Sequence, residues 1–185
     1  MPIALLDLPS SHRLNDGKLD PAGRLWVGTI NTADEPSGTA ALYVVLNDRL
    51  EEVEGGYANA NGKTWSSDGT VMYHADISRG TICTYDYDIE TGTPSNKRVF
   101  VRHEDWNPDG LSIDPDGNLL VAVFGGGRVE VYSHRGDRMS DIELPAPNDT
   151  SCDLAEDGTL FVTTACDGMS PEARAKAPQS GAMPL

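Results

Sequence analysis

The feature that most constrains the fold is a strand–turn–strand outline that occurs four times along the chain. In each copy a short apolar strand leads into a turn that ends in glycine, and a second strand follows. The copies read NDGKLDPAGRLWVGT, NGKTWSSDGTVMYHA, PDGLSIDPDGNLLVAV and TSCDLAEDGTLFVTT. The turn glycines are Gly23, Gly69, Gly117 and Gly158, which lie 46, 48 and 41 residues apart. This spacing is the period of a four-stranded propeller blade.

Further strand-like segments lie between the copies. TICTYDYD and RVFV, for example, separate the second copy from the third and bring that unit to four strands. Helical crossovers, which a parallel α/β sheet requires, are not evident in the sequence. The sequence therefore predicts an all-β fold, a β-propeller, with about four blade repeats.

Composition excludes some classes of partner. The formal net charge is −15, so the chain has no basic surface with which to bind nucleic acid or an anionic membrane. The three cysteines have no zinc or disulfide spacing, which fits a reducing compartment. The sequence shows no signal peptide and no apolar run long enough to span a membrane. We expect a cytoplasmic protein whose partner is a small molecule; the oligomeric state is not predicted.

The repeat register selects four polar positions. Eight residues before each turn glycine stand Asn15, Asn61, Asp109 and Thr150. Equivalent positions of successive blades converge around the central axis, so these side chains should surround one mouth of the channel. Amide and carboxylate oxygens suit Ca²⁺, Mg²⁺ or Mn²⁺. The competing interpretation is that Asn-Gly and Asp-Gly are ordinary loop turns. The shared register favours Asn61 and Asp109 as ligands, whereas Asp116-Gly117 is read as a hairpin turn.

Other motifs do not support a site. DPDGN resembles the start of an EF-hand loop, but its twelfth position is Gly125 and no helix flanks it. Ser151 lacks a nucleophile-elbow motif. The GGGRV segment has no following helix that could hold a phosphate, so it is interpreted as a blade turn. The tryptophans are assigned to packing, although Trp106 could form a wall of the site, and Cys152 is assigned to the core.

Four motifs in order resemble the senescence-marker-protein, gluconolactonase and regucalcin-like lactonase family. They are RLNDGKLDPAGRLWVGT, NGKTWSSDG with YHAD, PDGLSIDPDGNLLVAVFGGGRV and ELPAPNDTSCDLAEDGTLFVTTA. The resemblance implies a six-bladed propeller that hydrolyses sugar or other small lactones. It also implies one divalent cation, typically Ca²⁺ and sometimes Zn²⁺ or Mn²⁺. By motif, Asn61 and Asp109 would be metal ligands, Asp109 also the catalytic base, and Arg13 and Asn15 substrate contacts.

The chain departs from the family pattern in three respects. The family's metal site also uses a glutamate near the N-terminus, ahead of all four motifs, and we expect this sequence to lack it. About four units are present where six are expected. An acidic substrate contact has no clear counterpart; Asp34 and Glu35 lie in the corresponding region but out of register. We therefore expect one partial propeller domain over residues 1–185, with an irregular C-terminal segment at 167–185. Two hypotheses follow: a metal-dependent lactonase, or an inactive or weakly Ca²⁺-binding truncated propeller that acts as a scaffold.

Overall fold

The computed structural model describes residues 7–33 and 38–181, and its strands form antiparallel sheets. The first sheet contains β1 (His12–Leu19), β2 (Leu25–Asn31), β3 (Ala40–Leu46) and β4 (Arg49–Tyr57). The second contains β5 (Ala60–Trp65), β6 (Val71–Asp76), β7 (Thr81–Asp88) and β8 (Thr93–Arg102), with a 3₁₀ turn, η1 (Ile77–Arg79), between β6 and β7. The third contains β9 (Pro108–Ile113), β10 (Leu119–Val123), β11 (Arg128–Tyr132) and β12 (Arg138–Glu143). Strands β13 (Asp149–Leu154) and β14 (Leu160–Thr164) form a two-stranded fourth sheet.

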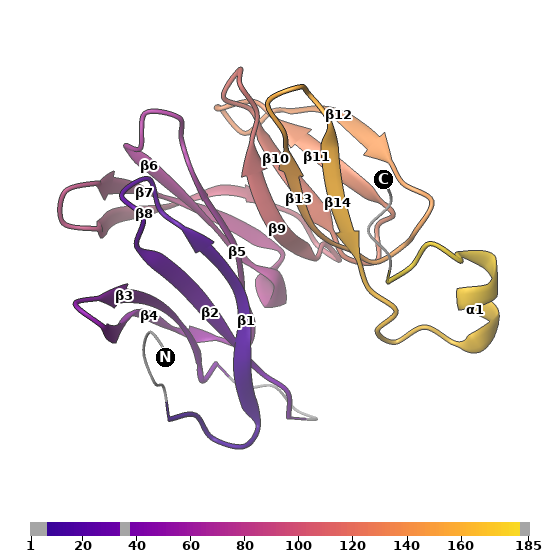
Figure 1. Cartoon of the computed structure of the whole chain (residues 1–185), viewed down its shortest axis with the longest axis horizontal. Helices are drawn as coiled ribbons and strands as arrows, with labels where there is room; N and C mark the ends of the chain where they lie inside the picture. Colours follow the sequence, from indigo (N-terminus) through magenta and orange to yellow (C-terminus); the bar gives the residue numbers. More distant parts are fainter. Residues whose placement is uncertain (1–6, 34–37, 182–185) are drawn as a thin grey trace.

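Each sheet begins with a strand near the middle of the molecule. Strands β1, β5, β9 and β13 lie side by side in the centre, and the later strands of each sheet extend outward (Figure 1). Neighbouring sheets contact each other through these innermost strands, β1 with β5, β5 with β9, and β9 with β13. This is a propeller arrangement, as the repeat predicted. Within the described residues the fourth repeat comprises two strands.

The four repeat glycines occupy the predicted turns. Their φ angles are +83°, +70°, +82° and +85°, a region that residues with a Cβ rarely adopt. In each turn the glycine N–H donates to the carbonyl three residues earlier, at 2.8–3.0 Å. Asp116-Gly117 is therefore the hairpin turn between β9 and β10, as expected. The same backbone requirement, met four times, explains the periodicity of the sequence.

The core lies between adjacent blades. Trp26, Trp65 and Tyr87 pack edge to face or tilted between the first and second sheets, with ring centroids 5.7–6.0 Å apart. Trp106 is buried among the residues between the second and third sheets. Cys152 is buried between the third and fourth. The packing roles predicted for the tryptophans and for Cys152 are confirmed.

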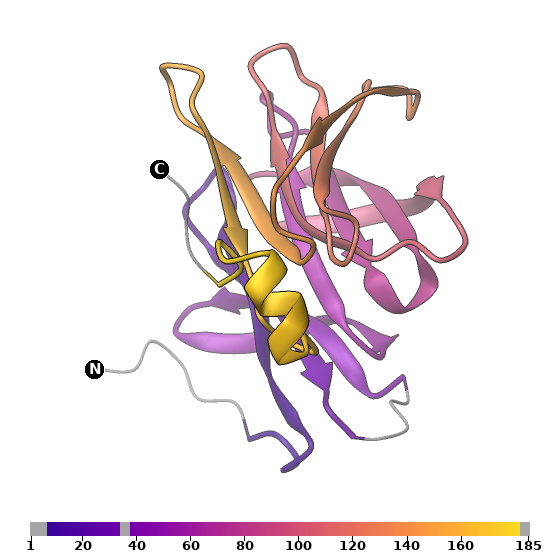
Figure 2. The same cartoon turned by 90° about the vertical axis from the view of Figure 1, so that its right-hand side faces the viewer.

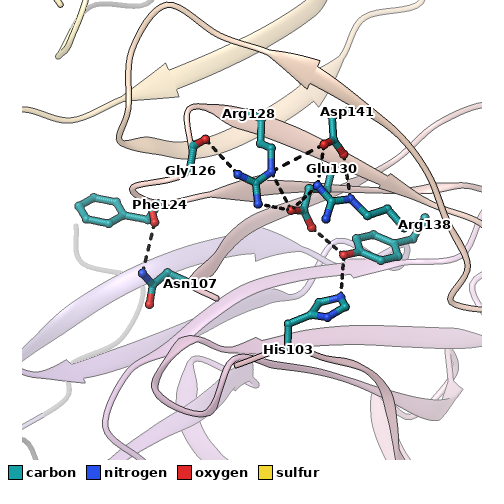
Figure 3. Close-up of polar contacts among 9 residues, drawn as sticks. His103, Asn107, Phe124, Gly126, Arg128, Glu130, Arg138 and Asp141 are labelled. Carbon is teal, nitrogen blue, oxygen red and sulfur yellow. Dashed lines mark hydrogen bonds and ion pairs between the residues drawn. The ribbon is translucent and has the colours of Figure 1, made fainter. Parts of the chain in front are cut away.

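A buried carboxylate in the third sheet is surrounded by donors (Figure 3). Glu130 of β11 is fully buried, and its Oε1 accepts hydrogen bonds from Arg128 Nε at 2.8 Å and Nη2 at 2.6 Å. Arg138 Nη2 lies 3.0 Å from the same oxygen, and Tyr132 Oη donates to Oε2 at 2.6 Å. Asp141 in turn pairs with Arg138 at 2.6 Å. We call these five residues the Glu130 cluster.

The segment after β14 folds back toward that strand. It contains the short helix α1 (Pro171–Lys176), which projects from the sheets (Figures 1 and 2). Ser170 caps the helix through Ala173 N–H. Hydrogen bonds from Gly181 N to Thr164 Oγ1 at 3.0 Å and from Arg174 Nη2 to Cys166 O at 3.2 Å tie the segment to the end of β14. In the described part of the chain, none of the helices has the length and apolarity that crossing a bilayer demands.

Candidate functional site

The predicted site residues lie together in one cleft among the innermost strands. The cleft has a volume of about 510 Å³ and receives side chains from all four innermost strands. Arg13, Asn15, Asn61 and Asp109, the four residues selected from the sequence, all line it. Its other lining residues are Asp16, Ile30, Asn59, Ile77, Phe124, Thr150, Ser151, Ala165 and Asp167. The ring inferred from the repeat register is therefore present, while the roles of its members remain predictions.

Every innermost strand is irregular at the position that faces the cleft. The pairing register shifts between Leu14 and Gly17 in β1, and between Ala60 and Lys63 in β5. Corresponding shifts occur in β9, whose partners move from Val121 to Val123, and in β13 between Asp149 and Ser151. A β-bulge redirects the side chains it contains. The ring residues Asn15, Asn61, Asp109 and Thr150 all lie within these bulges.

The glycines that follow Asn61 and Asp109 are needed for packing. A Cβ on Gly62 would lie 2.0 Å from the Asp109 carbonyl oxygen, and one on Gly110 would lie 2.3 Å from Ser151 Oγ. Each glycine therefore lets the next innermost strand approach closely. Asn61-Gly62 and Asp109-Gly110 are thus not hairpin turns, because each glycine serves an inter-strand contact while the residue before it faces the cleft.

Asn61 and Asp109 are polar residues of the cleft whose oxygens are incompletely paired within the described structure. Asn61 is 3% exposed, yet its Oδ1 has no hydrogen-bond partner among the described residues. Burial raises the pKa of Asp109 to about 7, and the neighbouring Asp16 carboxylate adds to the rise. A hydrogen bond from the Asn61 side chain and the charge of Lys63 oppose it. An unpaired amide oxygen beside a destabilised carboxylate is a donor set that fits a hard cation.

Arg13 and Asn15 are held by a short chain of hydrogen bonds. Arg13 Nη1 donates to Asn15 Oδ1 at 3.2 Å and to the Leu14 carbonyl at 3.1 Å. Asn15 Nδ2 donates to Asn59 Oδ1 at 2.7 Å, which connects β1 to the loop before β5. Both side chains line the cleft, and each has N–H groups beyond those used in these contacts.

Three polar residues at the site were not identified from the sequence. Asp16 lines the cleft next to Asn15, and Asn59 receives the Asn15 amide. Lys63 is fully buried, and its Nζ donates to the Asp16 carbonyl at 2.6 Å and to Asp16 Oδ2 at 2.7 Å. The motifs NDG and ANANGK contain all three, within two residues of Asn15 or Asn61. That closeness in sequence was the available signal.

Other candidates lie elsewhere. Trp106 does not line the cleft; it lines a neighbouring hollow beside η1. His74 is buried in β6 and hydrogen-bonds to the Gly62 carbonyl through Nδ1 at 3.1 Å. Asp34 and Glu35 lie outside the described residues. Within residues 7–33 and 38–181, no three His, Cys, Asp or Glu side chains gather in a metal-binding group, so a cation here would depend on amide and carbonyl oxygens as well.

Known proteins resemble this chain over most of its length. Regucalcin from Danio rerio is 39% identical over 190 residues, a match that covers 97% of this chain and 63% of the relative. A Bacillus subtilis protein named as sugar lactone lactonase YvrE is 33% identical, with 96% of this chain and 62% of the relative covered. The chain spans about three fifths of the length of these curated relatives.

The fold is also that of solved relatives. The crystal structure of a calcium-binding protein, regucalcin, from Agrobacterium tumefaciens superposes with a TM-score of 0.90 at 29% identity. The superposition covers 98% of this chain and 63% of that structure. The family model for the SMP-30/gluconolactonase/LRE-like region matches residues 3–166. This chain therefore belongs to the SMP-30/gluconolactonase/LRE-like family, whose members include proteins named as lactonases.

Proposed function

We propose that the cleft hydrolyses a small sugar lactone with the help of a divalent cation. The observation that carries this proposal is the buried Asn61 Oδ1, which lacks a hydrogen-bond partner beside the Asp109 carboxyl in the described structure. A buried amide oxygen left without a partner costs free energy, so its retention in the cleft favours a ligand there. Asn61 and Asp109 would hold the cation, with Ca²⁺ the first choice and Zn²⁺ or Mn²⁺ the alternatives.

The residues of the chain divide the remaining work. A bound divalent cation supplies Lewis acidity to polarise the lactone carbonyl. Asp109 accepts a proton from the attacking water, and the proton is delivered to the ring oxygen when the ester C–O bond breaks. The product is an open hydroxy acid. Arg13 and Asn15 donate hydrogen bonds to substrate hydroxyls, which orient the ring.

The test is hydrolysis of gluconolactone by the purified chain, measured as base uptake above the spontaneous rate. Assays with Ca²⁺, Mn²⁺ or Zn²⁺ and with chelator establish the cation dependence. We expect turnover that chelator abolishes. We also expect Asn61→Leu, which keeps the side-chain volume but removes the oxygen, to need a higher cation concentration for half-maximal turnover. Equal turnover with chelator and with cation would refute the proposal.

A second function is favoured by one observation. The described residues contain no group of three acidic, histidine or cysteine ligands, and charge count tunes Ca²⁺ affinity. The chain would then bind Ca²⁺ weakly without turnover and serve as a scaffold. Calcium binding by calorimetry, with no lactone hydrolysis from the same folded sample, would favour this second function.

A further inference from the structure

Lys63 is a fully buried lysine that joins two blades beside the candidate site. It belongs to β5, a strand whose six residues are all buried, and its ammonium contacts both the carbonyl and the carboxylate of Asp16 in β1. Removing an ammonium from water is costly unless it is paired. The structure provides such a partner, because the buried Lys63 ammonium lies 2.7 Å from Asp16 Oδ2. Asp16 is therefore the partner that makes the buried ammonium tolerable.

The same ion pair fixes the irregular part of β1. Asp16 lies in the bulge between Leu14 and Gly17, directly after Asn15. With two contacts from Lys63, at 2.6 and 2.7 Å, the bulge is attached to the neighbouring blade. Asn15 lies in the same bulge, directly before the attached residue.

The ammonium also belongs to the charge balance of the cleft. Asp16 and Asp109 both line the cleft, and the Lys63 ammonium lies 2.7 Å from the Asp16 carboxylate. Two carboxylates, one ammonium and the unpaired Asn61 oxygen thus share one small region. A divalent cation bound there meets a positive charge already in place and competes with it for Asp16.

We propose that Lys63 is a built-in counter-ion of this site. It pairs with the Asp16 carboxylate and so weakens divalent-cation binding. The same pairing holds the β1 bulge in place. The inference rests on the cation site of the proposed function. It assigns to Asp16 a role that the sequence motifs did not suggest, that of a carboxylate which a cation can use when the ammonium is absent. The Lys63 side chain then increases the stability of the fold and decreases the affinity for the cation.

The test is calorimetric titration of the purified chain with CaCl₂ and with MnCl₂, together with thermal unfolding. Lys63→Met keeps the length of the side chain and removes the charge, so we expect cation affinity to rise by at least about tenfold and the unfolding temperature to fall. Adding Asp16→Asn to Lys63→Met should return the affinity to or below that of the unaltered chain, because the gain acts through Asp16. A purely structural lysine would lower stability without tightening cation binding.

Lys18→Met is the matched control. Lys18 lies on β1, two residues after Asp16, and its Nζ donates to the Leu111 carbonyl at 3.0 Å instead of to a carboxylate. We expect its removal to change cation affinity less than about threefold. A comparable rise in Lys18→Met would mean that net charge alone is responsible, which overturns the proposal.

The remaining outcomes are also decisive. Unchanged or weaker cation binding in folded Lys63→Met overturns the inference, as does no binding to either chain up to about 10 mM, beyond the weakest protein Ca²⁺ sites. If Lys63→Met does not fold, Lys63→Gln decides, because it keeps a hydrogen-bond donor for Asp16 and removes the charge: tighter cation binding supports the inference, and unchanged or weaker binding overturns it. Tighter binding in Lys63→Met without lactone hydrolysis by the unaltered chain would refute the proposed function and leave this inference standing.

Discussion

Two carboxylates in this molecule, the fully buried Glu130 and the half-buried Asp109, have opposite surroundings. Glu130 accepts hydrogen bonds from Arg128 and Tyr132 and pairs with Arg138, so that both of its oxygens are occupied (Figure 3). Asp109 lies in the cleft, receives a hydrogen bond from Asn61, and has the Asp16 carboxylate as a neighbour. Glu130 is surrounded by positive charge, whereas Asp109 has a negative neighbour in Asp16 and a positive one in Lys63.

The difference separates a structural acid from a functional one. A buried charge whose oxygens are all engaged stabilises its local arrangement and has little capacity left for a ligand. A carboxylate with too few donors is costly for the fold and is available to a cation, a water or a substrate. Asp149 is a third case, because it is fully buried but does not line the cleft. Substitutions at these positions can break or sharpen the comparison.

The largest expected effect is on catalysis, from Asp109→Asn. The change keeps the shape of the side chain but removes the proton acceptor, so we expect kcat/KM for gluconolactone to fall by about 10²–10³. The variant should unfold at a temperature no lower than that of the unaltered chain, because the lost charge was poorly compensated and costly for the fold. Asp116→Asn is the control, since Asp116 is exposed and belongs to the hairpin turn. Equal losses in the two variants would contradict the assignment of Asp109.

Glu130→Gln should lower the stability of the chain and leave catalysis unchanged, the opposite of Asp109→Asn. Two arginines of the Glu130 cluster then lose their shared partner, and we expect the free energy of unfolding to fall by about 3 kcal/mol. Urea denaturation measures this change. Hydrolysis per folded molecule should remain at the level of the unaltered chain. Loss of activity without loss of stability would show that the cluster is more than structural.

Asp149→Asn should stabilise the chain at neutral pH. Burial raises the pKa of Asp149 to about 6. Among the described residues no hydrogen bond of normal geometry reaches its oxygens, although the Arg128 backbone N–H lies near enough to oppose the rise. A carboxyl with a folded-state pKa above its unfolded value of 3.8 makes the free energy of unfolding fall as pH rises from about 4 to about 6.

Asp149→Asn has no carboxyl to ionise at this position, so its free energy of unfolding does not fall in this way as pH rises. At pH 7 it should be more stable by about 2 kcal/mol, and near pH 4 the two chains should be nearly equal. Urea denaturation at both pH values provides the measurement. A stability difference that does not depend on pH would mean that the ionisation of Asp149 is not the cause.

The smallest expected effect is from Asn15→Ala. One hydrogen bond to substrate, with a net value of about 1 kcal/mol, is removed, so KM for gluconolactone should rise by roughly fivefold while kcat changes little. Steady-state kinetics separates the two constants. A fall in kcat as large as that of Asp109→Asn would place Asn15 in the chemical step instead of in binding.

The sequence by itself determined the propeller, because a turn glycine must adopt positive φ in every blade and so recurs at the blade period. The same register was sufficient to predict that Asn15, Asn61 and Asp109 share one cleft. What it could not supply was the contact between blades. Whether Asp109-Gly110 is a turn or a close packing point depends on Ser151, which lies 41 residues away. Only the tertiary structure, by bringing β5 against β1, decided that Lys63 is buried and that Asp16 is its partner, because a charge's surroundings are set by strands distant in sequence.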